Sequence, residues 1–93
     1  MNLLQITYHG ATLALEIGPT PSVTLRINGL VRDEATSDAD SVTLRVNSTV
    51  QTDYEWHEFI EGVVRYDGAR VLACIIANKQ ELIREEYGRV VTP

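Results

Sequence analysis

The sequence predicts a small all-β domain, folded as an antiparallel meander barrel or a two-layer sandwich of about seven to eight short strands. Apolar residues alternate with polar ones at a period of two, as in Val23, Leu25 and Ile27. Such alternation is typical of strands with one buried and one exposed face. The pairs Asn28-Gly29 and Asp67-Gly68 predict two-residue hairpin turns, because a type I′ turn needs positive φ at both central residues.

An internal repeat supports the same fold class. Residues 22–31 and 41–50 lie 19 positions apart and are identical at seven of ten positions. In each copy, alternating apolar and polar residues lead to a small polar residue. The repeated unit is therefore interpreted as a β-strand that runs into a tight turn.

The strands are expected to follow one another along the chain, separated by short turns and polar loops. The expected strands span about residues 3–8, 11–17, 22–27, 30–35, 41–50, 54–66, 69–77 and 81–87. Residues 18–21 are expected to form a loop, because their two prolines cannot donate to a sheet ladder. Residues 36–40 form a polar connection, and the tail at 90–93 is expected to fray.

Two segments also fit a helix. Thr52 and Glu55 have the spacing of a capping box, and Gly62 could end a helix that begins there. The fold class therefore has a second form, mainly β with one short helix near residues 52–61. Residues 78–87 could also be helical, but their sequence resembles residues 28–34, which favours a strand.

The chain is expected to form a single β domain over residues 1–93, since two domains would each be too small to bury a core. A flat open sheet would leave one face uncovered, so the strands should close into a barrel or pack as two layers. Unpaired strand edges could pair with a protein partner or with a second copy of the chain.

The charge of the chain narrows the classes of partner. The chain has eight Lys and Arg residues and thirteen Asp and Glu residues, for a formal net charge of −5, so direct nucleic-acid binding is not expected.

The longest apolar run, Val71–Ala77, is far shorter than the roughly 18 residues of a membrane span. The start of the chain has no signal-peptide pattern, and we expect a soluble cytoplasmic protein that does not bind membranes.

The residues that could support chemistry are few. His57 and Glu61 would share a helix face and could hold a cation there, although surface charges often have this spacing. The only cysteine, Cys74, lies in an apolar strand and is interpreted as a small core residue. Phosphate-binding loops and catalytic-triad patterns are absent from the sequence. We therefore expect a non-enzymatic protein without a cofactor or metal site.

One segment concentrates the aromatic residues. Tyr54, Trp56, His57 and Phe59 combine aromatic rings with acidic neighbours and are the possible interface residues. The alternative is that Trp56, together with Phe59 or Ile60, anchors the core. The expected function is a non-enzymatic interaction or assembly module that acts through a surface or by self-association. Two alternatives are a binder of small apolar ligands in a barrel interior and an acidic inhibitor that docks on a basic partner.

Overall fold

The computed structural model describes the backbone of residues 2–53 and 56–88, and within these ranges it forms eight antiparallel strands and no helix. The strands are β1 (Asn2–Tyr8), β2 (Ala11–Ile17), β3 (Ser22–Ile27), β4 (Leu30–Thr36), β5 (Ser41–Asp53), β6 (Trp56–Asp67), β7 (Arg70–Ala77) and β8 (Gln80–Gly88). The predicted all-β class is confirmed, and the strand interpretation of residues 78–87 is confirmed by β8.

The alternative prediction of a short helix near residues 52–61 is wrong, because residues 52–53 and 56–61 lie in strands. β5 continues to Asp53 and β6 begins at Trp56. In β6, Ile60 is fully buried whereas its neighbour Phe59 is exposed. This alternation continues to Gly62, which is buried in the middle of the strand and does not end a helix. Burial at a period of two therefore prevails over the local helix-capping pattern.

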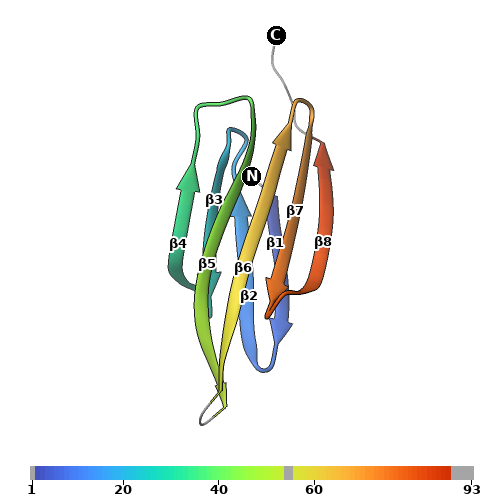
Figure 1. The fold of residues 1–93 in the computed structure, drawn as a ribbon. Helices are drawn as coiled ribbons and strands as arrows, with labels where there is room; N and C mark the ends of the chain where they lie inside the picture. Colours follow the sequence, from blue (N-terminus) through green and yellow to red (C-terminus); the bar gives the residue numbers. More distant parts are fainter. Residues whose placement is uncertain (1, 54–55, 89–93) are drawn as a thin grey trace.

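The strands form two separate four-stranded sheets that pack face to face (Figure 1). Sheet A has the order β1-β2-β3-β4, and sheet B has the order β5-β6-β7-β8. Each sheet is a simple meander, and residues 37–40 connect the two. Strand pairing between described residues occurs only within each sheet, so the barrel is not closed. Of the two predicted architectures, the sandwich is the one observed.

Asparagine closes an equivalent hairpin in each sheet. Asn28, between β3 and β4, and Asn78, between β7 and β8, both have positive φ. The backbone N–H of Asn28 donates to Thr12 O, and its Oδ1 accepts from Thr12 N, each at 2.9 Å. Asn78 makes the same two bonds with Phe59, at 2.9 and 3.0 Å. Asparagine tolerates positive φ, and here its hydrogen bonds also join each turn to the second strand of its sheet, β2 or β6.

The turn predicted at Asp67-Gly68 lies one residue further along. Asp67 pairs with Arg70, so Gly68 and Ala69 are the central residues, and only Gly68 has positive φ. This pattern fits a type II′ turn, which has glycine at the first central position.

The repeated segments occupy different places in the two sheets. Residues 22–27 form β3, the third strand of sheet A, and this copy ends at the Asn28-Gly29 turn. The second copy belongs to β5, the first strand of sheet B, which continues without a turn to Asp53. The repeat therefore predicts strands correctly, but it does not mark equivalent positions.

The interior between the sheets is almost entirely aliphatic. The buried core side chains alternate along the strands that supply them, as predicted, whereas β4 and β8 contribute only partly buried side chains. The buried core side chains are Leu4, Ala11, Leu13, Leu15, Ile17, Val23, Leu25, Ile27, Leu44, Val46, Val50, Ile60, Val64, Tyr66, Val71, Ala73, Ile75 and Ala77.

Tyr66 is the one core side chain in this set with a polar group, and its hydroxyl connects the two sheets. From β6 it reaches the β2–β3 loop of sheet A, where the hydroxyl donates to Gly18 O at 2.8 Å or Ser22 O at 3.0 Å. It also accepts a bond from Ser22 N at 3.3 Å. A buried hydroxyl is costly unless it is hydrogen-bonded, and the loop carbonyls provide its partners.

One side of the sandwich is closed by the bulge in β4. Arg32 is the extra residue of this bulge, because Leu25 pairs with Asp33 and Arg26 with Val31. The Arg32 guanidinium donates to Thr49 O of β5 at 3.1 Å, and the Asp33 carboxylate accepts from Asn47 N at 2.9 Å. Two backbone groups on the edge of sheet B thus find side-chain partners in sheet A, which protects that edge.

Gly62 allows the sheets to approach closely. A Cβ added at Gly62 would lie 2.5 Å from Leu15 Cδ2 and 2.9 Å from Val46 Cγ2.

We predict that Gly62→Ala lowers the free energy of unfolding by about 1–3 kcal/mol, the usual cost of overpacking a core. Urea unfolding measures the change. The control is Gly88→Ala, where the new methyl group would meet no atom within 4 Å. Equal stability of the two variants would contradict this account of Gly62.

We predict that Tyr66→Phe destabilises the protein by about 1–2 kcal/mol, because carbonyl groups of the β2–β3 loop lose their donor. The matched control is Tyr87→Phe, since the Tyr87 hydroxyl makes a single bond, 3.5 Å long, to the exposed Leu3 carbonyl. That variant should change stability by less than about 0.5 kcal/mol. Chemical unfolding of both variants tests the difference, and a loss as large for Tyr87 as for Tyr66 would show that the sheets do not depend on the Tyr66 contact.

Candidate functional site

The β5–β6 hairpin is much longer than the hairpins of sheet A. β5 has 13 residues and β6 has 12, whereas the strands of sheet A have six or seven. Figure 1 shows that the hairpin extends past the β1–β2 turn. Val50 and Ile60 are buried near its base. We call the strand ends beyond them, residues 51–53 and 56–57, the β5–β6 arm.

Three of the four predicted interface residues lie along this arm and at its base. Tyr54 is outside the described residues. Trp56 is the first residue of β6 and pairs through its backbone with Asp53, while its side chain is outside the described part. His57 is exposed, and Phe59 is 42% exposed. Because they are two residues apart in a strand, His57 and Phe59 point to the same outer face of sheet B. Of the two core anchors considered beside Trp56, Ile60 is buried in the core and Phe59 is not.

A polar cluster holds the base of the arm between the two sheets. Glu58 and Ile60 point inward from β6. The Tyr8 hydroxyl, at the end of β1, donates to Glu58 Oε2 at 3.1 Å, and the side-chain amide of Asn78 donates to the same oxygen. The Tyr8 ring also meets the His9 ring edge-on, with centroids 4.3 Å apart. One carboxylate oxygen thus links the end of β1 in sheet A to the β7–β8 turn of sheet B.

The environment of Tyr8 favours its neutral form. Partial desolvation raises the pKa of the Tyr8 hydroxyl, and the hydrogen bond to Glu58 and the negative charge of Glu58 raise it further. At neutral pH the hydroxyl therefore keeps its proton and serves as a donor to the carboxylate.

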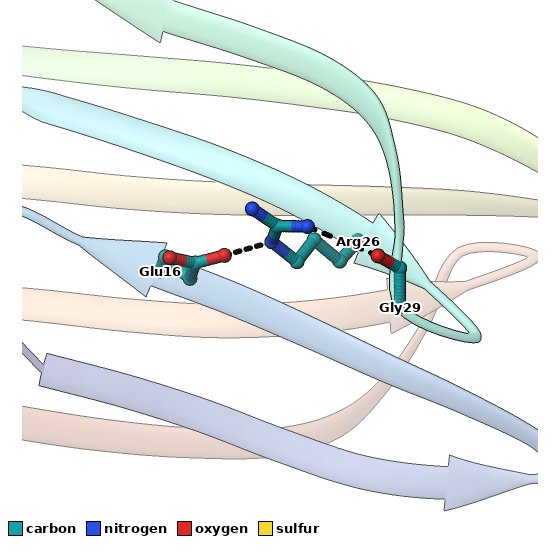
Figure 2. A network of polar contacts seen from close by, with 3 residues as sticks. All are labelled: Glu16, Arg26 and Gly29. Carbon is teal, nitrogen blue, oxygen red and sulfur yellow. Dashed lines mark hydrogen bonds and ion pairs between the residues drawn. The ribbon is translucent and has the colours of Figure 1, made fainter.

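Arg26 borders a shallow depression of about 390 Å³ on the outer face of sheet A. Ala14 lies at its floor, because its short side chain stands between Gln5 and Arg26 in the register of the sheet. Figure 2 shows that Arg26 lies between Glu16, with which it forms an ion pair, and the Gly29 carbonyl. The depression is lined by Asn2, Leu3, Gln5, Thr12, Ala14, Glu16, Arg26 and Gly29.

The structure does not bring together His57 and Glu61, the two residues considered as ligands of a cation. His57 and Glu61 lie four residues apart in β6, which separates them by about 13 Å along an extended strand. Within the described residues, no three His, Cys, Asp or Glu side chains gather in a way that could hold a metal ion.

The placement of Cys74 in the core is wrong. Its neighbours Ala73 and Ile75 are fully buried between the sheets, whereas Cys74 lies on the outer face of sheet B and is partly exposed. Desolvation is the main cause that raises the pKa of the Cys74 thiol, and the charge of Glu81 adds to it. The thiol is therefore protonated at neutral pH and is a weak nucleophile.

Comparisons with protein-family models, with curated proteins and with solved structures found no match. Within the part of the chain that the structure describes, no helix could serve as a membrane span.

Sequence reasoning found the aromatic segment but missed the polar cluster that supports it. Tyr8 and Glu58 are 50 positions apart, and neither belongs to a recognisable motif. The Asn78 side chain, from the turn between β7 and β8, contacts both Glu58 and Phe59, and no sequence motif links these three residues.

We predict that the contribution of Tyr8 to stability is lost in alkaline solution. The folded state holds the phenol proton more tightly than the unfolded state, whose pKa is about 10. This contribution is therefore fully present below pH 10 and declines as the pH rises through the raised pKa. Urea unfolding of the wild type and of Tyr8→Phe should show a stability difference that shrinks above about pH 10. A difference that stays constant up to pH 12 would contradict the proposed contact, because Tyr87 and all other groups titrate in both proteins.

Proposed function

We propose that this chain is a non-enzymatic interaction module that binds a protein partner through the β5–β6 arm and its base. The length of the β5–β6 hairpin carries the proposal, because its end extends past the strands of sheet A. A strand pair without a packing layer on one side can receive a partner there. The sequence places the only Trp and the only Phe of the chain in this region.

Phe59 combines an exposed aromatic side chain with a backbone that is held by hydrogen bonds, which suits it to binding a partner. The residue is 42% exposed, while its backbone N–H and carbonyl are both bonded to Asn78 at 3.0 and 2.9 Å. An aromatic side chain on a fixed backbone loses little conformational entropy when it binds. Such a ring can bury a large apolar area in a partner's pocket.

The charge of the region favours a basic partner over a second copy. Residues 46–64 contain four acidic residues, Asp53, Glu55, Glu58 and Glu61, and neither Lys nor Arg. Two such arms would repel each other, whereas Lys or Arg at the rim of a partner's apolar pocket would attract one. The partner class is therefore a protein or peptide that combines an apolar pocket with a basic rim.

Glu58 supports a binding role over a catalytic one. Both the Tyr8 hydroxyl and the Asn78 amide occupy its Oε2 atom. A carboxylate engaged in this way positions the neighbouring turns and is poorly available as a general base.

The alternative of a small apolar ligand stays a prediction. The eight described strands do not close into a barrel that could hold such a ligand. The depression around Ala14 and Arg26 is the place on sheet A where one could bind.

We predict that Phe59→Ala weakens partner binding by at least about tenfold, or about 1.4 kcal/mol. Binding is measured on an array of peptides that combine Lys or Arg with apolar residues, and it should weaken as salt is raised. The matched control is Leu30→Ala, because Leu30 is 67% exposed on β4 and lies outside the arm. Both variants should keep the far-ultraviolet spectrum of the wild type. The proposal fails if no peptide depends on Phe59, or if Leu30→Ala causes an equal loss.

A further inference from the structure

Over residues 2–53 and 56–88, the chain crosses between the sheets only once. Strands β1 to β4 form sheet A, strands β5 to β8 form sheet B, and residues 37–40 are the connection, seen in Figure 1 as the loop from β4 to β5. In sandwiches with interleaved strands, a single opening cannot separate the layers. Here each layer is one continuous half of the chain, and a change at the connection alone could separate them.

The contacts between the layers therefore join residues before the connection to residues after it. The Tyr66 hydroxyl contacts Gly18 and Ser22, and Tyr8 contacts Glu58. On the β4–β5 side, Arg32 donates to Thr49 O and Asp33 accepts from Asn47 N. Each of these bonds, and the aliphatic packing between the sheets, would form equally well if sheet B came from another molecule.

The connection is suited to opening. Asp38, Ala39 and Asp40 are all exposed, and the strands on both sides are complete without them. Ser37 N donates to Pro21 O at 3.0 Å, which keeps the start of the connection on sheet A. A change at residues 38–40 therefore costs no core contact.

We propose that a second copy of this chain is a partner that each sheet is built to accept: two molecules open at residues 38–40 and exchange sheets, forming a dimer of two complete sandwiches. The exchange keeps every contact between layers, so monomer and dimer differ mainly in the connection and in the entropy of association. A short connection holds the two sheets at a high effective concentration, which favours the closed monomer in dilute solution.

Deleting residues 37–40 tests this inference, because it joins Thr36 directly to Ser41 with their Cα atoms only 3.8 Å apart. Even the tightest hairpins need about two connecting residues, so the closed monomer would have to unravel its strand ends. We expect the deletion variant to have twice the monomer mass by light scattering and an unchanged far-ultraviolet spectrum. The control replaces residues 37–40 with Gly-Ser-Gly-Ser, which keeps the length and should remain monomeric. A monomeric deletion variant with wild-type stability would overturn the proposal.

A second experiment covers a deletion variant that does not fold. The wild-type chain, in two forms of different mass, is unfolded together in denaturant and refolded at about 1 mM, where intermolecular pairing competes with closure. We expect a mixed dimer that persists on dilution, because its separation requires the sheets to part. Recovery of monomer alone would overturn the proposal. Phe59→Ala should leave the exchanged dimer intact, so this result is independent of the proposed function of the arm.

Discussion

No backbone hydrogen bond joins the two sheets among the described residues, so the fold depends on the side chains that cross between them. Aliphatic burial is strong but has no direction, and alone it would let one sheet slide over the other. The position of one sheet relative to the other is set by contacts that have a definite shape or direction. Leu15 fits over the bare Gly62 backbone, and Tyr66 hydrogen-bonds to a loop of the opposite sheet. At the other end of the sandwich, Tyr8 and Glu58 make the corresponding polar link.

Contacts between the sheets also cover a strand edge, where unpaired backbone groups could otherwise pair with another chain. The edge of β5 receives Arg32 and Asp33 from the bulge in β4. This protected edge faces the opposite sheet. The β5–β6 hairpin extends beyond this protection, since sheet A has no strand long enough to follow it. The candidate surface is thus a consequence of unequal strand lengths.

Local patterns predicted the strands well because most strands bury one face and most turns carry Gly or Asn. They failed where the local sequence fits two structures. The capping pattern at Thr52 and Glu55 is compatible with a helix, and only the burial of Ile60 and Gly62 against sheet A decides for a strand. Cys74 lies in a strand with apolar residues on both faces, so periodicity could not tell the inner face from the outer. The link from Tyr8 to Glu58 depends on how the sheets pack, and no local pattern contains that information.

The two sheets repeat one structural unit that the sequence repeat does not mark. In both sheets an asparagine turn is bonded to the neighbouring strand, and a bulge follows in the last strand. The bulge residue differs: Arg32 reaches across to β5, whereas the corresponding Leu82 packs against the core. The hydrogen bonds of this unit lie within one sheet, so they do not depend on which molecule supplies the opposite sheet. The specificity between halves then resides in few residues, with Arg32, Asp33 and Tyr66 foremost among them. A sheet from a second molecule would offer those residues the same partners.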